Sequence, residues 1–242
     1  MIRRFQSQPE QRAALYSALE RHHPTFRTGG DLYRDEIRKV VRPGVIVLDA
    51  GCGHGGIITE FRDQIGKLFG VDVAAEDVRR FTILDQGIVS DLASIPLPDS
   101  SVDVITGEFV LEHLQHPLAV FQELRRVLRS NGTMIFLTPN IRHPVMAMAR
   151  ITPTMFHRWW KGSVLKSHAG AQPTYYRANT PQAIRTLAIK TGLRLERLEL
   201  AGNPEYLAIN QTLMKPAIKL EKYLATRQPE RQMYIVIVLK KT

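Results

Sequence analysis

Cysteine is nearly absent from this chain of 242 residues, in which Cys52 is the single example. One cysteine excludes an intramolecular disulfide and any metal site built from several cysteines, and it favours a reducing, cytoplasmic compartment. Long apolar runs are also missing. The N-terminal MIRRFQSQPE leads into no apolar stretch, and YIVIVL at residues 234–239 has only the length of a strand. We therefore expect neither an export signal nor a membrane span.

Aspartate is missing after Asn140, and acidic residues of either kind become scarce there. Residues 140–242 contain 17 Lys and Arg against 5 Glu, a balance of +12, whereas residues 1–139 contain 16 basic against 18 acidic residues, a balance of −2. The whole excess of +10 therefore lies in the C-terminal part. Two interpretations stay open: a solvated basic surface, or the recruitment of an anionic substrate, a membrane surface or a nucleic acid.

Short apolar segments alternate with amphipathic ones along most of the chain. The apolar segments predict strands at residues 45–51, 67–73, 87–92, 101–110, 133–140, 193–202 and 231–241. Helical periodicity predicts helices at residues 9–23, 30–41, 56–66, 75–85, 117–129, 180–192 and 213–226. This alternation predicts an α/β fold with a doubly wound parallel sheet, whose ligand lies at the carboxyl ends of the strands. We expect a single domain over residues 1–242, with residues 1–42 as a helical cover.

The stretch VLDAGCGHGG, residues 47–56, fits two different cofactors. Gly51, Gly53 and Gly56 satisfy the dinucleotide pattern G-x-G-x-x-G, while Asp49, Gly51, Gly53 and Gly55 satisfy the pattern D-x-G-x-G-x-G of proteins that bind S-adenosylmethionine (SAM). Asp49 distinguishes the two. A carboxylate at the end of the first strand would repel a pyrophosphate lying over the turn, but it suits the ammonium and sulfonium groups of SAM.

Five motifs occur in a fixed order: LDAGCGHG, GVD, SDLASIPLPDSSVDVI, VLEHLQHP and LRRVLRSNGTMIFLTPN. With this set, residues 37–140 resemble the class I SAM-dependent methyltransferases. The resemblance implies a Rossmann-like, doubly wound, seven-stranded sheet. It also implies that the last strand, here MYIVIVLKK at residues 233–241, is antiparallel and lies between the fifth and sixth strands.

The resemblance assigns nine residues to a bound SAM. An acid and three glycines form the methionine side of the pocket, a second acid holds the ribose, three residues enclose the adenine, and a third acid lies near the methionine moiety. In that order they are Asp49 with Gly51, Gly53 and Gly55, then Asp72, then Val73, Asp91 and Leu92, and finally Glu108. For each acid the alternative is a helix cap or a surface charge.

His113, in the stretch VLEHL, is the first candidate for a general base. It lies just beyond the fourth strand, where it would face the cofactor, and the alternative is a structural histidine that binds backbone. The same stretch resembles the metal-binding motif E-x-x-E-H of some methyltransferases. Glu112 and His113 match that motif, but Phe109 stands where its first glutamate belongs. We therefore predict no metal.

Residues 141–179 form an insertion after the fifth strand that is too long for an ordinary connection. In this fold such a segment commonly covers the acceptor, so we expect a lid, although a packed structural segment is the alternative. The insertion contains His168, Tyr175 and Arg177. We take His168 and Tyr175 as further catalytic candidates, and the mixture of aromatic and cationic groups favours an anionic or aromatic small molecule.

These observations predict a SAM-dependent methyltransferase that acts on a small-molecule acceptor at oxygen, in a monomer or a homodimer. Three alternatives remain. A nucleic-acid methyltransferase would use the basic half, but the sequence contains no RNA-binding module and no NPPY-like stretch for flipped bases, so we expect no nucleic acid. A SAM-binding scaffold without catalysis and a nicotinamide-dependent oxidoreductase are the others.

Overall fold

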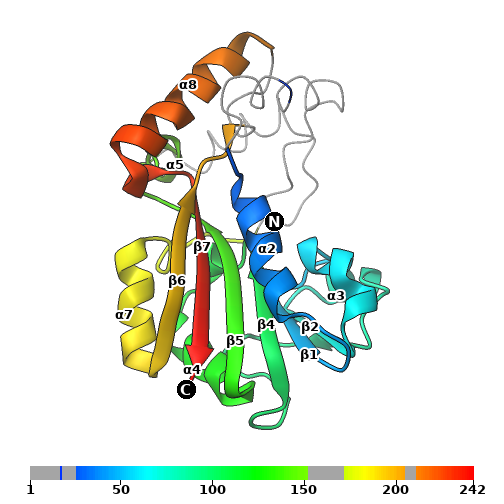
Figure 1. Ribbon diagram of the computed structural model, residues 1–242. Coiled ribbons are helices and arrows are strands. Elements are labelled where there is room, and N and C mark those ends of the chain that lie inside the picture. Colours follow the sequence, from blue (N-terminus) through cyan, green and yellow to red (C-terminus); the bar gives the residue numbers. More distant parts are fainter. Residues whose placement is uncertain (1–16, 18–25, 152–171, 205–210) are drawn as a thin grey trace. The chain divides into compact units, whose positions relative to one another are not determined.

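A seven-stranded sheet forms the centre of the fold (Figure 1). The computed structural model describes residue 17 and residues 26–151, 172–204 and 211–242. The strand order is β3-β2-β1-β4-β5-β7-β6. The strands are β1 Ile46–Ala50, β2 Lys67–Asp72, β3 Gln86–Val89, β4 Val102–Glu108, β5 Leu128–Pro139, β6 Leu193–Ala201 and β7 Tyr234–Lys241.

The direction of the strands determines where a ligand can bind. The pairs β1–β2, β2–β3, β1–β4 and β4–β5 are parallel. In Figure 1, β7 runs opposite to its neighbours β5 and β6. The chain order reverses between β1 and β4, and in doubly wound sheets ligands bind at the carboxyl ends of the strands beside such a reversal. The predicted fold class is therefore confirmed, including its antiparallel last strand.

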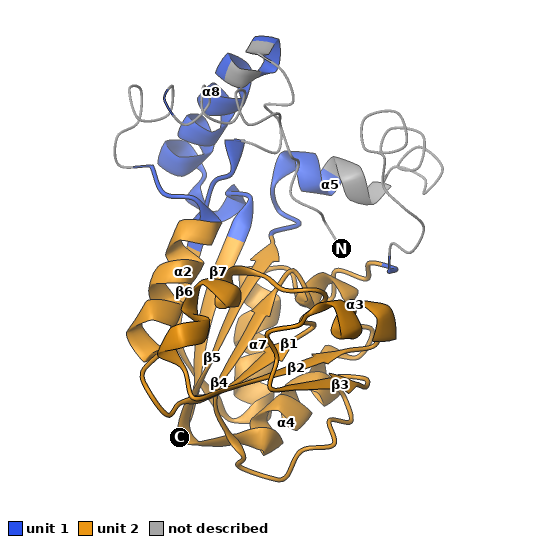
Figure 2. Ribbon diagram, turned by 90° about the vertical axis from the view of Figure 1, so that its right-hand side faces the viewer, with its two compact units in different colours: residues 1–29, 140–173, 200–234 blue, residues 30–139, 174–199, 235–242 orange. Residues whose placement is uncertain are grey.

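Helices cover both faces of the sheet. Figures 1 and 2 show α2 on one face, with α4 and α7 on the other. The helices are α2 Gly29–Val40, α3 Ala75–Arg80, α4 Pro117–Val127, α5 Pro144–Ile151, α7 Pro181–Thr191 and α8 Gln211–Arg227. Within the described ranges they are accompanied by the 3₁₀ helices η1 Ile57–Gln64, η2 Leu111–His113 and η4 Pro229–Arg231.

Local signals explain the bounds of α7. The Thr180 hydroxyl oxygen accepts a hydrogen bond from the backbone N–H of Ala183 at 3.1 Å, and Pro181 occupies the first turn. Gly192 ends the helix in the left-handed conformation, with φ of 64°. A threonine cap, an early proline and a terminal glycine are the residues that helix ends prefer, and the sequence predicted this helix from them.

Three predicted helices differ from those observed. Residues 57–64 form a 3₁₀ helix, preceded by Gly56 in an extended conformation with no side-chain cap. The helix expected over residues 75–85 ends at Arg80, because the buried side chain of Phe81 follows in a non-helical conformation. Helix α4 ends two residues early, because the fully buried Leu128 already belongs to β5.

The insertion and the N-terminus agree with the sequence only in part. Within residues 141–179, expected to be irregular, residues 144–151 form α5. The helix predicted at residues 9–23 lies outside the described residues, apart from residue 17.

Apolar side chains of α4 pack onto the sheet. Phe121 and Leu124 are fully buried, and the Phe121 ring stacks on Phe136 of β5 with centroids 5.8 Å apart. Burying a side chain of this size contributes roughly 1.5–3 kcal/mol. The spacing of buried residues along α4 explains why this segment forms an amphipathic helix.

The chain divides into two compact units, coloured separately in Figure 2. Unit 1 comprises residues 1–29, 140–173 and 200–234, and unit 2 comprises residues 30–139, 174–199 and 235–242. Each unit is treated separately below, and a single domain over residues 1–242 stays a prediction. Among the helices that the structure describes, none is both long and apolar enough to cross a bilayer.

Candidate active site

The glycine turn after β1 requires glycine for conformational and steric reasons. Gly51, Gly53 and Gly55 have φ values of 69°, 51° and 110°, a region that other residues rarely adopt. A Cβ atom on Gly51 would also overlap the side chain of Val110. The Gly51 and Cys52 N–H groups donate to the Val71 carbonyl at 2.8 and 3.1 Å, which ties the turn to β2.

Asp72, the last residue of β2, holds this turn from the other side. Its Oδ2 accepts from the Gly53 N–H and its Oδ1 from the Ala74 N–H, both at 2.9 Å. Each carboxylate oxygen keeps lone pairs for a ligand hydroxyl. The next residue, Val73, is 53% exposed beside it. Asp72 therefore shapes the turn, and its part in holding a ribose stays a prediction.

Asp49 is almost completely buried at the end of β1, with 5% of its surface exposed. Its Oδ1 accepts a hydrogen bond from the Thr106 hydroxyl at 2.9 Å. Burial above all, helped by the nearby negative charges of Glu108 and Asp72, raises the pKa of Asp49 to about 7, while the hydrogen bond from Thr106 opposes the shift. The structure thus brings three acids of the predicted site close enough to repel one another.

Glu108 faces the glycine turn from β4. Its Oε2 accepts from the Ile57 N–H at 2.9 Å, at the start of η1. Tyr33 of α2 lies on the same side: its hydroxyl oxygen accepts from the Gly107 N–H at 3.1 Å. Burial, followed by the charges of Asp49 and Glu108, raises the Tyr33 pKa well above its usual value. Sequence reasoning missed Tyr33, because an apolar-looking helix face gives no sign of a distant partner.

The segment after β3 carries the residues predicted to meet adenine. Leu92 is buried, whereas Asp91 is exposed and its Oδ1 accepts from the Ala93 N–H at 2.8 Å. Asp91 therefore shapes its own turn.

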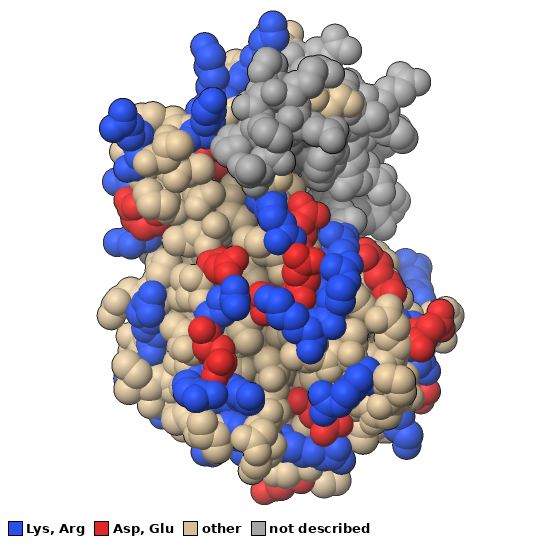
Figure 3. Space-filling view, in the orientation of Figure 1, with Lys and Arg blue, Asp and Glu red and all other residues tan. Residues whose placement is uncertain are grey.

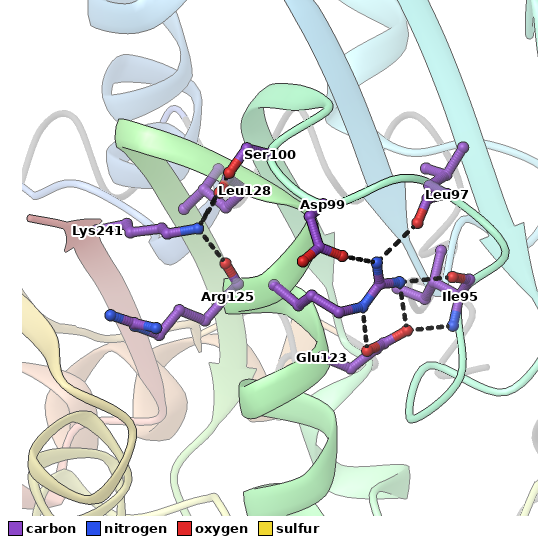
Figure 4. Close-up of polar contacts among 9 residues, drawn as sticks. Ile95, Leu97, Asp99, Ser100, Glu123, Arg125, Leu128 and Lys241 are labelled. Carbon is purple, nitrogen blue, oxygen red and sulfur yellow. Dashed lines mark hydrogen bonds and ion pairs between the residues drawn. The ribbon is translucent and has the colours of Figure 1, made fainter.

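Arg126 of α4 fixes the chain that follows this segment. Figure 4 labels its partners Ile95, Leu97, Asp99 and Glu123. Its guanidinium donates to the Ile95 and Leu97 carbonyls at 2.9 Å and to Asp99 Oδ1 at 2.6 Å. Glu123 binds both that guanidinium and the Ile95 N–H. The fork of guanidinium donors, together with this carboxylate, fixes the path of residues 95–99, a support that the sequence did not reveal.

The loop after β4 contains a buried polar chain centred on Glu112. The Thr138 hydroxyl donates to Glu112 Oε2 at 3.2 Å, and the Asn179 amide donates to Thr138 Oγ1 at 2.7 Å and to the Pro139 carbonyl at 3.1 Å. Among the described residues, no donor reaches Glu112 Oε1 or Asn179 Oδ1. Burial raises the pKa of Glu112 to about 7, which favours a neutral carboxyl in this position.

Glu112 also anchors the segment that carries Tyr175. Its carbonyl accepts from the Tyr175 and Tyr176 N–H groups at 2.8 and 3.1 Å. Tyr176 and Phe109, on either side of this contact, have φ values of 52° and 57°, which are uncommon for residues other than glycine. Backbone held in such conformations tends to occur at functional sites. No local sequence pattern predicts this contact between Glu112 and the segment of Tyr175.

The three catalytic candidates differ in exposure and in contacts, and one of them lies outside the described residues. His113 ends η2 and is half-buried, and its backbone N–H donates to the Val110 carbonyl at 3.0 Å. Tyr175 is 37% exposed, with the Arg177 guanidinium 5.7 Å from its ring centre. Arg177 also donates to the Gln115 carbonyl at 2.7 Å. His168 lies outside the described residues.

Metal ligands do not gather in the part of the chain that the structure describes. No group of three or more His, Cys, Asp or Glu side chains within the described ranges has the arrangement to hold an ion. Glu112, which matches the sequence motif for a metal ligand, directs its carboxyl to Thr138 instead.

Comparison with known proteins agrees with this geometry. The sequence profile of a family described as "Methyltransferase domain" matches residues 48–136. Malonyl-[acyl-carrier protein] O-methyltransferase of Yersinia pestis is 29% identical over 133 residues, covering 52% of this chain and 50% of that protein. A ubiquinone/menaquinone biosynthesis C-methyltransferase of Burkholderia cenocepacia is 35% identical over 107 residues, covering 40% of this chain and 44% of that protein.

The fold extends beyond the region of sequence similarity. The crystal structure of a putative sarcosine dimethylglycine methyltransferase from Galdieria sulphuraria superimposes with a TM-score of 0.57 at 17% identity, covering 88% of this chain and 85% of that one. The chain spans about half the length of the curated relatives it matches. The matched residues contain most of β1, its glycine turn, β4 and most of β5. Residues 48–136 therefore match a methyltransferase domain, and most of the chain has the Rossmann-like fold of solved SAM-dependent methyltransferases.

Proposed function

We propose that this protein transfers the methyl group of SAM to an oxygen atom of a small-molecule acceptor. The observation that carries the proposal is the set of three acids at the glycine turn. Asp49 is buried at the end of β1, Asp72 binds the Gly53 N–H, and Glu108 binds the N–H that follows the turn. Their negative charge suits a cationic ligand and disfavours a pyrophosphate.

The raised pKa of Asp49 strengthens this argument. An ionised Asp49 is destabilised by burial and by Glu108 and Asp72, so an added cation would stabilise the ionised form. SAM supplies an ammonium and a sulfonium. A dinucleotide would instead bring two further negative charges to a turn that already has three acids.

The rest of the predicted cofactor site fits an adenosine moiety. Asp72 faces the turn with lone pairs for ribose hydroxyls, and the exposed side chain of Val73 offers an apolar surface to a flat ring. Asp91 and Leu92 would lie at the other edge of the adenine, on a segment whose continuation is fixed by Arg126.

The chemistry needs alignment and, for a hydroxyl acceptor, a base. The acceptor oxygen attacks the methyl carbon in line with the departing sulfur, so the C–O bond forms as the C–S bond breaks. The hydroxyl proton would pass to the imidazole of His113, at the end of η2 after β4. Among the curated relatives, one is named an O-methyltransferase and another a C-methyltransferase. The choice of oxygen therefore depends on His113.

Tyr175 and Arg177 support an aromatic or anionic acceptor. The Tyr175 ring is partly exposed beneath the guanidinium of Arg177, and both residues are tied to the loop after β4, through Glu112 and Gln115 respectively. An aromatic face with a cation above it can bind a flat or carboxylated molecule. The acceptor is thus expected to have a ring, a carboxylate or both.

Mass spectrometry can test this proposal directly. We expect incubation with SAM labelled by a deuterated methyl group to release S-adenosylhomocysteine and to yield an O-methyl ether or ester from a panel of phenols and carboxylic acids. Matched anilines and C-nucleophiles should react less. Label found only on nitrogen or carbon would contradict oxygen transfer. Binding of SAM with no turnover on a cell extract would favour the scaffold alternative.

A further inference from the structure

The outward face of α8, in unit 1, carries cations and no exposed acid. Lys215, Lys219, Lys222 and Arg227 are all exposed. Glu221 is the one carboxylate in the α8 sequence, and it is buried with 1% of its surface exposed. The inward face carries apolar residues that include Ala217, Ile218 and Leu224. We call the exposed side the α8 face.

Three lysines of the α8 face form a row. Positions 215, 219 and 222 follow the i, i+4, i+7 spacing, which keeps side chains on one stripe of a helix. The row extends for about 10 Å along the helix axis, at 1.5 Å per residue. Tyr223 follows Lys222 directly, on the flank of this row, and is 52% exposed. The face therefore combines a line of ammonium groups with one protruding aromatic side chain.

The cations of this face form no ion pairs with carboxylates of the described residues. Within the described ranges, no carboxylate lies within ion-pair distance of Lys215, Lys219, Lys222 or Arg227, and the nearest exposed acid along the chain is Glu230, three residues after Arg227. Several exposed arginines of unit 2 are paired instead, for example Arg38 with Asp35 at 2.6 Å and Arg79 with Glu76 at 2.7 Å.

The acid of α8 is itself directed inward. Glu221 Oε1 lies 3.4 Å from Nε2 of the fully buried His143, so this carboxyl group is held inside unit 1. The surface of α8 therefore exposes four cations and does not expose its one carboxyl group. Figure 3 shows Lys and Arg side chains projecting where α8 lies in Figure 1.

We propose that the α8 face binds an anionic membrane surface without crossing it. Anionic lipid headgroups present many negative charges at no fixed spacing, which suits a row of ammonium groups on long flexible stems. Tyr223 adds an amphipathic ring of the kind enriched at the depth of the headgroups. An acidic protein presents its charges at fixed positions, whereas these lysine side chains are flexible, exposed and held by no partner among the described residues that would fix their positions. We therefore favour lipid.

The expected affinity comes mainly from charge. Each lysine near an anionic bilayer improves binding roughly fivefold at moderate ionic strength, so three together contribute on the order of a hundredfold. Concentrated salt removes this contribution to the affinity, because it screens the charges: the Debye length falls to about 3 Å at an ionic strength of 1 M. Binding should therefore be strong in dilute salt and largely lost in concentrated salt.

Vesicle co-sedimentation of the full chain tests the proposal. We expect binding to vesicles of phosphatidylcholine with phosphatidylglycerol and little binding to phosphatidylcholine alone. The triple substitution K215Q/K219Q/K222Q should weaken binding on the order of a hundredfold. A matched control, K67Q/R185Q/K190Q, removes three exposed cations of unit 2 and should weaken it much less. Both variants should keep the wild-type circular dichroism spectrum and S-adenosylhomocysteine affinity, which separates this proposal from the methyltransferase assignment.

Two further arms decide between lipid and protein. Tyr223→Ser should weaken binding to anionic vesicles severalfold, while leaving binding to soluble polyglutamate unchanged. Equal losses in the two triple variants would overturn the proposal. It would also be overturned if the folded protein bound polyglutamate through the three lysines but failed to bind anionic vesicles at low salt, because that result would identify an acidic protein as the partner.

Discussion

Replacing His113 by alanine should lower kcat by on the order of a hundredfold or more on a hydroxyl acceptor, with little change in SAM affinity. General base catalysis typically contributes a factor of this size. His113 ends η2, just beyond β4. The pH profile of kcat should also lose an ionisation near neutrality. Steady-state kinetics of the purified variant across pH, with the affinity for S-adenosylhomocysteine measured separately, would establish both effects.

His116→Ala is the matched control, because His116 lies three residues further along, is exposed and precedes α4. Its kcat should remain close to that of the wild type. If the acceptor is already a good nucleophile, such as a carboxylate, alignment suffices and His113→Ala should cost much less. A folded His113→Ala enzyme with nearly wild-type kcat on a hydroxyl acceptor would remove His113 from the mechanism. The base would then be sought at His168 or Tyr175.

The stability of the protein should fall as the pH rises from 4 to 7, because of two buried carboxyls. Burial raises the pKa of Asp49 and of Glu112 to about 7 in the folded chain. Between pH 4 and pH 7 the unfolded chain has released these protons while the folded chain still holds them. Each rise of one pH unit therefore lowers the free energy of unfolding by about 1.4 kcal/mol per group. Below pH 4 both states hold the protons, and above pH 7 neither does. The full cost for each group is about 3–4 kcal/mol.

Denaturant unfolding of Asp49→Asn and Glu112→Gln at pH 5 and pH 8 measures this effect. Each amide variant should gain stability relative to the wild type as the pH rises. The control Asp63→Asn, at an exposed position of η1, should follow the wild type. A difference between wild type and Asp49→Asn that stays constant from pH 5 to pH 8 would show that burial does not control this carboxyl. Cofactor binding should partly reverse the trend, because a cation beside Asp49 favours its ionised form.

The succession of strands along the chain and the glycine turn could be predicted because their signals are local, whereas the place of the last strand in the sheet came from the family resemblance. The apolar run before Asp49 and the closely spaced glycines identify a buried strand that enters a glycine turn, and both are observed. Thr180 and Gly192 likewise mark the ends of α7 by residue type alone. Such features depend on a few neighbouring residues, so one sequence suffices to find them.

Long-range contacts could not be predicted in the same way. Glu112 meets Thr138 and, through it, Asn179, a residue 67 positions away in the chain. Tyr33 reaches the backbone of Gly107 from a helix that looked like a simple cover. Phe109 and Tyr176 adopt left-handed conformations, which the sequence does not predict because neither residue is a glycine. These features arise from the packing of distant segments, which periodicity and local motifs do not encode.

Calorimetric titration of the full chain with S-adenosylhomocysteine and with NAD tests the central claim most directly, because it identifies the cofactor that the chain binds. The three acids at the glycine turn predict that S-adenosylhomocysteine binds and NAD does not. Asp72→Ala should weaken that binding, because it removes the carboxylate that holds Gly53 and faces the ribose. Tight binding of NAD, with no response to S-adenosylhomocysteine or SAM, would contradict the account.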